Sequence, residues 1–373
     1  MFASGAAIFT HYVMAPNAYH TILSVVFHLL ILYLCISPII KFAKYQARRS
    51  FRLLDDNRFK ILAYSLILLQ LFSITYFAQE DVAMLLRGDF SQIRSEILAS
   101  ERGTGSIFRT IAGVGSYYYC YNMILFFYSL AFRKDRKIFL ILLMVSSVSR
   151  VFHSLTYMGR DGILFWLLSF VVSYFIFKPY IKNEASVFLR KIFISIGGLS
   201  IFLFLAISVS RFGDSDNGVF YSLIDYFGQP INNFGVMFHQ FHDYSGTKTV
   251  LPLLYGEKGI SGGDVLADTD YFMSKYGFAN NSFKTFVGSF YMAWGPVFTT
   301  IMALIYSVVM VSQINRCRDI TIPAVIVLMI SIQIVIHNYF YWAYYIGVAN
   351  LFLFTTPVFL IWCSKSSGVK VDI

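Results

Sequence analysis

The chain has 373 residues, of which 57% are hydrophobic and only 13% are charged, and its mean hydropathy is +0.63. A soluble domain carries about one half apolar and one quarter charged residues. The excess of apolar side chains excludes an ordinary soluble protein and requires lipid to cover it. The long apolar runs are continuous rather than alternating, and only helices or closed barrels satisfy the backbone in lipid. The composition therefore predicts an all-α, polytopic transmembrane helical bundle.

The net charge of +10 would also fit a nucleic-acid-binding protein. Lysine and arginine, however, accumulate in the cytoplasmic loops of membrane proteins, so we expect no nucleic-acid partner. The four cysteines fall in expected spans or cytoplasmic segments and form no CxxC pattern, which predicts neither disulfides nor a cysteine metal site. Residues 1–19 lack a basic leader region and a clear cleavage site, so no removable signal peptide is expected.

The apolar runs predict about nine transmembrane spans, each of roughly 20 mainly apolar residues. In chain order they cover residues 20–40, 61–79, 111–132, 138–158, 163–178, 192–210, 285–311, 322–338 and 346–363. Residues 2–17 stay unassigned and could form a partial or re-entrant segment, so a count of 9–11 fits the pattern. No soluble domain interrupts residues 1–373, which we interpret as one integral membrane domain.

The charged connections predict which side each loop occupies. The short connections at 41–60, 133–137, 178–191 and 313–321, and the tail from Lys365, are net basic and are therefore placed in the cytoplasm. The opposite side receives a first loop at 80–110, a tight turn at 159–162, and a long loop at 211–284 between spans six and seven, with five basic and eight acidic residues. Loops on a rigid frame tend to carry function, so the external side is the expected active side.

Within the long loop, residues 219–229 and 231–241 are aromatic and amphipathic. Segments of this kind tend to lie in the membrane interface rather than cross it. We expect two interfacial pieces separated by Pro230.

Arg150 falls inside the fourth expected span, where an arginine is costly unless it faces the bundle interior or a wet cavity. At about 100° per residue, His153, Tyr157, Arg160 and Asp161 lie on the same third of the helix circumference. One interpretation is structural, with Arg150 tying helices together. The favoured interpretation is that this stripe forms one wall of an anion-binding cavity, because it climbs to the external surface.

The external segments also contain an unusual number of arginines: Arg87, Arg94, Arg102 and Arg109 in the first loop, and Arg211 after the sixth span. The first loop uses arginine without lysine. Guanidinium groups bind phosphate bidentately and stay charged. The set predicts a phosphate or diphosphate ligand near the outer surface, although each arginine alone also fits a headgroup anchor.

Acid–base candidates are more numerous. Asp161 ends the polar stripe, Glu101 lies beside Arg102, and His239 lies in the long loop. His239 and His242 are three residues apart, but the sequence shows no third convergent ligand, so we expect no metal site. Walker A, GxSxG and HExxH motifs are absent, which argues against a nucleotide-dependent enzyme and predicts no cofactor.

Four segments resemble the Wzy-type O-antigen polymerases, the oligosaccharide repeat-unit polymerases of bacterial inner membranes. They are QIRSEILASERGTG, YMGRDGILFW, SVSRFGDSD leading to DYFGQPINNFG, and FVGSFYMAWGPVFTTIMALIYS. Some family members carry arginine and glycine separated by ten residues in external loops. Arg94 and Gly105 have this spacing, whereas Ser222 stands at the corresponding position after Arg211.

The resemblance implies a GT-C-like fold in the bacterial inner membrane, active on its periplasmic face without a metal. The enzyme would move a growing glycan from undecaprenyl diphosphate onto a lipid-linked repeat unit, with membrane lipid and a chain-length regulator as further partners. Arg160 and Arg211, assisted by Arg94 or Arg150, would stabilise the diphosphate leaving group. Asp161, His239 and Glu101 are the candidate general bases.

Three alternatives stay open at this point. An O-antigen ligase shares the many-helix frame and the arginine-containing external loop. A lipid-linked oligosaccharide flippase is disfavoured because transporters usually have two halves with similar loop lengths, and the loop at 211–284 breaks such symmetry. A membrane acyltransferase lacks a recognisable intramembrane histidine motif here.

Overall fold

The computed structural model describes residues 22–46, 50–87, 106–157, 159, 161–183, 185–187, 189–191, 194, 198, 218–255, 271–278, 285–317, 319–336, 339, 342–344, 346–364 and 366–371. Its α-helices are α2 (Ile22–Gln46), α3 (Asp56–Arg87), α5 (Ile107–Tyr117), α6 (Tyr119–Phe132), α7 (Lys137–Ser146), α8 (Ser149–Leu155), α9 (Asp161–Phe177), α11 (Gly218–Gln240), α13 (Thr285–Arg316), α14 (Ile322–Ile336) and α15 (Gly347–Ser364). Three 3-10 helices are η1 (Lys178–Tyr180), η2 (Gly246–Thr249) and η3 (Pro252–Tyr255), and the strands are β1 (Phe51–Leu54) and β2 (Ser366–Val371).

Within the described residues, six stretches of helix are long and apolar enough to cross a membrane. They are Leu23–Lys44, Asp56–Glu80, Lys137–Leu155, Asp161–Tyr180, Thr285–Arg316 and Gly347–Ser364. The predicted helical, multi-pass character is therefore confirmed. Two further expected spans form shorter apolar helices, Tyr119–Phe132 and Ile322–Ile336. The expected span at 192–210 lies outside the described residues, apart from Ile194 and Gly198.

Two of the expected spans are interrupted rather than continuous. The span expected at 111–132 divides into α5 and α6 at Tyr118, and the span expected at 138–158 divides into α7 and α8 at Ser147 and Val148. Next to each break a serine hydroxyl bonds the backbone three residues earlier, Ser116 to Gly113 O at 2.7 Å and Ser147 to Met144 O at 2.6 Å. Such local bonds compete with the helical pattern and bend helices.

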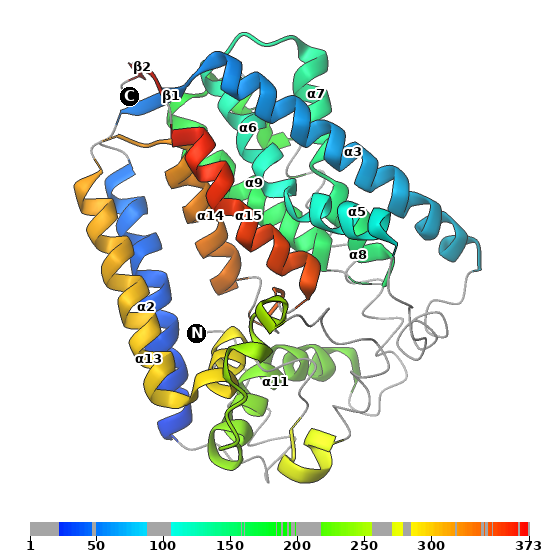
Figure 1. Ribbon diagram of the computed structural model, residues 1–373, viewed down its shortest axis with the longest axis vertical. Helices are drawn as coiled ribbons and strands as arrows, with labels where there is room; N and C mark the ends of the chain where they lie inside the picture. Colours follow the sequence, from blue (N-terminus) through cyan, green and yellow to red (C-terminus); the bar gives the residue numbers. More distant parts are fainter. Residues whose placement is uncertain are drawn as a thin grey trace.

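Helix α6 lies at the centre of the bundle, as Figure 1 shows, and every residue from Tyr119 to Ser129 is buried. Several buried polar side chains here bond to one another. The amide of Gln333 on α14 donates to the Tyr119 hydroxyl at 2.8 Å and accepts from the Tyr344 hydroxyl at 3.0 Å. This network ties α6 to α14 and to the segment that precedes α15.

We call one end of the molecule the sheet end, because β1 and β2 pair there in antiparallel register, with Phe51 opposite Val371 (Figure 1). Phe51 also forms a parallel bridge to Ile320 in the link between α13 and α14. Asp319 in that link accepts hydrogen bonds from Arg52 at 2.8 Å and Lys370 at 3.1 Å. Three basic segments far apart in the sequence are thus joined at one end.

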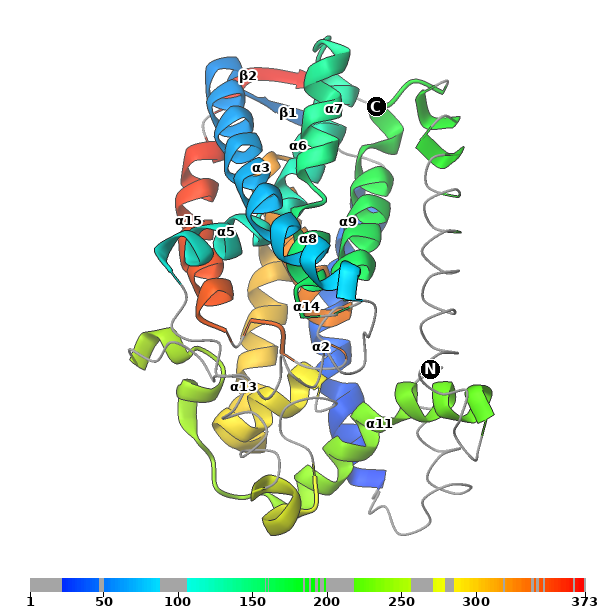
Figure 2. The same cartoon turned by 90° about the vertical axis from the view of Figure 1, so that its right-hand side faces the viewer.

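The opposite end, which we call the α11 end, holds α11, η2, η3 and the starts of α2, α13 and α15. Figure 2 shows α11 lying across the long axis of the bundle. The expected separation into two pieces at Pro230 is wrong, because α11 runs through this proline from Gly218 to Gln240. Its Phe234 packs against Phe27 of α2 and Tyr291 of α13, with ring centroids 6.1 and 5.9 Å away. These contacts hold α11 on the ends of two spans.

The orientation of the two ends can be tested with the chain's own cysteines. Cys317 at the sheet end is exposed, whereas Cys35, Cys120 and Cys363 are buried. If the basic sheet end is cytoplasmic, a membrane-impermeant maleimide should label Cys317 only after cells are permeabilised. A Cys317→Ser, Ser274→Cys variant, with its thiol at the α11 end, should be labelled in intact cells. The reverse pattern would overturn the predicted orientation.

Asp319 should control how firmly β2 is held. Hydrogen bonds from Lys370, Ser50 and Arg52 lower the pKa of Asp319 from 3.8 to about 2. A depressed pKa means that the stabilisation is present above about pH 4 and is lost as the pH falls through 2. We expect Asp319→Asn to weaken β1–β2 pairing by about 1 kcal/mol, seen as faster amide hydrogen exchange in β1 and β2.

The matched control for this variant is Lys60→Gln, which removes only an exposed pair with Asp56. This control should leave exchange in both strands unchanged. The difference between wild type and Asp319→Asn should shrink as the pH is lowered from 4 and disappear once the pH is well below 2. A difference that does not shrink over this range would show that the carboxylate charge is not what holds the strand.

Candidate functional site

Three of the residues predicted from the sequence lie within the described part of the chain: Arg150, Asp161 and His239. The other four, Arg94, Glu101, Arg160 and Arg211, lie outside the described residues. Arg150 and Asp161 come together at the junction of α8 and α9, which is therefore the candidate site.

Arg150 and Asp161 form a buried ion pair. Arg150 Nη2 lies 3.3 Å from Asp161 Oδ2, and the two side chains are 3% and 16% exposed. The guanidinium also lies over the Tyr117 ring of α5, 4.3 Å from its centroid. A buried arginine charge requires compensation of this kind, so the pair and the ring together explain how Arg150 is tolerated inside the bundle.

Two glycines bring the helices close enough for this contact. Gly159 N donates to Ser154 O at 2.8 Å and closes the turn after α8. A Cβ atom on Gly162 would lie 2.6 Å from Arg150 O and 2.3 Å from Ser154 Oγ. Only a residue without a side chain fits there, so Gly162 allows α9 to start directly against α8.

The polar stripe was expected on one helix, but α8 ends at Leu155 and Asp161 begins α9. The described members of the stripe still contact one another across this turn. Tyr157 donates to Asp161, with its hydroxyl 3.1 Å from Oδ2. Arg150 Nη1 lies 3.0 Å from His153 Nδ1. Because a guanidinium can only donate, Nδ1 accepts and the neutral ring carries its proton on Nε2. Ser116 of α5 adds a contact of 2.8 Å to the same nitrogen.

Some partners in this network were not identified from the sequence. Ser116 and Tyr117 come from α5, and Phe77 of α3 stacks on His153 with ring centroids 4.6 Å apart. No local pattern pointed to these residues, because their roles depend on packing between helices distant in the sequence.

The contacts of Arg150 fit the structural interpretation of this residue. Its charge is compensated by Asp161, and its side chain is almost completely covered. These contacts link α5, α8 and α9 to one another. Asp161 and Gly159 flank position 160, so this link also fixes the backbone on both sides of Arg160.

Arg109, one of the external arginines, is engaged by a carboxylate. Its Nη1 and Nη2 atoms donate to Glu80 Oε1 and Oε2 at 2.8 and 3.2 Å. This bidentate pair connects α3 to α5. In this structure the Nη1 and Nη2 donors of Arg109 are therefore used to join two helices, not to bind a ligand.

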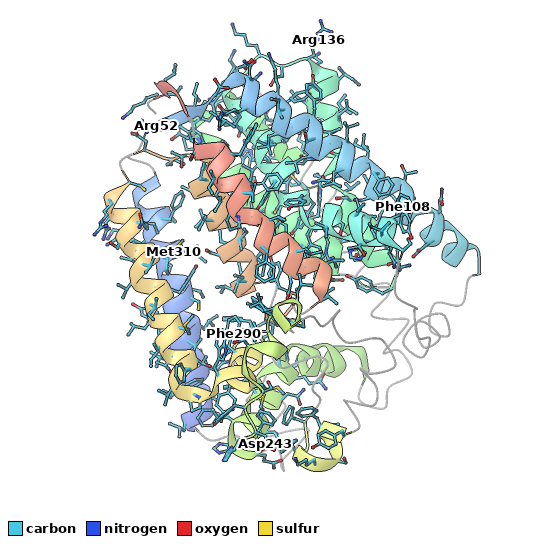
Figure 3. The ribbon with its side chains drawn as sticks, viewed as in Figure 1. Arg52, Phe108, Arg136, Asp243, Phe290 and Met310 are labelled. Atoms are coloured by element: carbon cyan, nitrogen blue, oxygen red, sulfur yellow. The ribbon has the colours of Figure 1, made fainter. Side chains whose placement is uncertain are left out.

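The α11 end carries a second polar cluster that the sequence did not indicate. His239 is half-buried near the end of α11, and Asp243 follows it. A hydrogen bond from Tyr276, then one from Lys275, lowers the pKa of Asp243. Lys275 Nζ lies 3.3 Å from the Asp243 carboxylate and 3.0 Å from the Tyr271 hydroxyl. Figure 3 places Asp243 at the far tip of the α11 end.

A pocket of about 400 Å³ lies at the sheet end, lined by Leu53, Leu54, Asp56, Tyr128, Phe132, Arg133, Lys134 and Asp135. Arg133 donates to Asp56 and, at 2.7 Å, to Asp135. These bonds clamp the turn between α6 and α7 to the start of α3. The pocket therefore lies where the α6–α7 turn meets the start of α3, away from the Arg150–Asp161 pair.

No protein-family model, curated protein or solved structure matches the chain.

Substitution of Gly162 should test the packing that creates the site. In Gly162→Ala the new Cβ meets the Arg150 backbone, which cannot yield as a flexible side chain would. We expect a loss of about 1–3 kcal/mol of stability, measured as a lower unfolding temperature in detergent. The control is Gly198→Ala, because a Cβ there meets nothing within 4 Å. Equal behaviour of the two variants would contradict the close α8–α9 contact.

Proposed function

We propose that this multi-pass protein is a glycosyltransferase of the bacterial inner membrane that polymerises lipid-linked oligosaccharide repeat units of O-antigen or a related surface polysaccharide. The donor is a glycan on undecaprenyl diphosphate, and the active face is the periplasmic one, at the α11 end. The bundle is of the GT-C-like kind. The observation that supports the proposal most is the compensated Arg150–Asp161 pair, which is next in sequence to a further arginine, Arg160.

The chemistry requires positive charge at this position. An acceptor hydroxyl oxygen attacks the anomeric carbon, the bond from that carbon to the diphosphate oxygen breaks, and the diphosphate leaves with the electron pair. Fixed guanidinium groups stabilise the charge that develops on it. In this proposal Arg160 and Arg211 contact the diphosphate, assisted by Arg94.

Arg150 and Asp161 take a positioning role in this scheme. Arg150 is neutralised and covered, so it holds the start of α9 rather than the substrate. The Asp161 carboxylate accepts from both Arg150 and Tyr157, so its oxygens are engaged within the protein. His239 and Glu101 are then the preferred candidates to accept the proton of the attacking hydroxyl.

Deletion of the gene should test the activity. Surface polysaccharide from the deletion strain, separated on a gel, should lose its long-chain ladder and keep a single repeat unit on the lipid core. Loss of all glycan from the core would point instead to a ligase or a flippase. An unchanged ladder would contradict a role in this polysaccharide.

Complementation with variants then tests the arginines. Arg160→Ala and Arg211→Ala should each reduce chain extension by about 10²–10³-fold, the usual effect of removing one charge-stabilising donor. Lysine at either position should rescue only partly, because it lacks the bidentate fork. The control Arg136→Ala, at the sheet end (Figure 3), should behave as wild type at equal expression. Full activity of both alanine variants would remove the diphosphate role.

A further inference from the structure

Arg58 and Trp362 form a contact at the sheet end that none of the roles above uses. Arg58 lies in the first turn of α3 and Trp362 in the last turns of α15, two helices that Figures 1 and 2 show side by side. Arg58 Nη1 donates to Trp362 O at 2.9 Å, and the guanidinium carbon lies 5.0 Å from the centroid of the indole. Trp362 Nε1 in turn contacts Arg58 O at 3.4 Å. The guanidinium is therefore held in one place.

The charge of Arg58 has no counter-ion within the described part of the chain. Arg52, Arg109, Arg133 and Arg150 each pair with a carboxylate. Arg58 forms no such pair among the described residues, and its side-chain hydrogen bond goes to a backbone carbonyl. The Nε and Nη2 donors are left to bind an anion from outside the protein.

Apolar side chains continue from this pair along both helices. On α3, Ile61, Tyr64 and Leu68 are 54%, 54% and 69% exposed. On α15, Val358 and Ile361 are 65% and 72% exposed. The spacing of three or four residues keeps each set on one helix face. Both sets belong to stretches that can cross a membrane, so hydrocarbon chains are their natural neighbours.

We propose that the Arg58–Trp362 pair is a binding site for an anionic phospholipid in the leaflet at the sheet end. The headgroup phosphate accepts from Nε and Nη2 of Arg58, and an acyl chain lies on the exposed side chains of α3 and α15. Basic groups between membrane helices bind acidic headgroups in this way, and tryptophan is enriched at headgroup depth. A soluble anion would use the arginine but not the apolar side chains, which favours a lipid. The site is independent of the glycosyltransferase proposal.

Native mass spectrometry of the full-length protein in detergent, titrated with phosphatidylglycerol or phosphatidylcholine, tests this site. Wild type should retain phosphatidylglycerol in preference to phosphatidylcholine. Arg58→Gln should bind phosphatidylglycerol about tenfold more weakly, since it loses charge-assisted hydrogen bonds. Arg58→Lys should lie between the two. The control Arg136→Gln removes the same charge from an exposed residue at the same end and should match wild type.

Several results would overturn the proposal. One is equal weakening in Arg58→Gln and Arg136→Gln, which would mean diffuse attraction rather than a site. Another is equal retention of the two lipids by wild type. Displacement of phosphatidylglycerol by millimolar inorganic phosphate would indicate a soluble-anion site. If Arg58→Gln proves unstable in detergent, Arg58→Lys carries the test alone, and unchanged binding by that variant also overturns the bidentate contact.

Discussion

Lipid offers no hydrogen bonds, so polar groups inside this bundle depend on other parts of the protein for their partners. The Arg150–Asp161 pair is the most demanding case, because a bare guanidinium at this depth would be prohibitively costly. The Arg150 charge is compensated by residues from other helices. The Asp161 carboxylate pairs with the guanidinium, and the Tyr117 ring lies against it. Gly162 lets the backbones of α8 and α9 come close together. The positions of α5, α8 and α9 follow from this requirement. The same rule explains why Gln333 and its hydroxyl partners join α6 to α14.

The sheet end and the α11 end are held together by different kinds of contact. At the sheet end, partly buried ion pairs around Asp319 and Arg133 join short basic segments. At the α11 end, aromatic contacts dominate, with Phe234 between α2 and α13. The sheet end is therefore held together mainly by charged groups, and the α11 end mainly by aromatic rings.

The sequence predicted the helical class and most spans, because span length depends only on the thickness of the hydrocarbon layer. Helical periodicity correctly grouped Arg150 with His153, but the continuation of that helix face to Asp161 was wrong, because α8 ends at Leu155 and Asp161 begins α9. The breaks at Tyr118 and Ser147 were not predictable, since apolar composition continues across them and the turn depends on local serine bonds and packing. Nor could the sequence show that Asp161 neutralises Arg150, or that Ser116 and Phe77 complete the network, because these are contacts between distant segments. The join of α11 across Pro230 was missed because proline is normally a helix breaker.

The pairing of β1 with β2 has a consequence for biosynthesis. Arg58 and Trp362, which meet beside this sheet, are 304 residues apart, and a ribosome adds about 5–20 residues per second. Strand β1 therefore waits roughly 15–60 s for β2, although Phe51 meets its ring partners in α6 and α9 earlier. During that interval β1 lacks its pairing partner. A bulky fusion placed directly after Val371 would hinder the pairing of β2 with β1. It would do so without touching the site between α8 and α9.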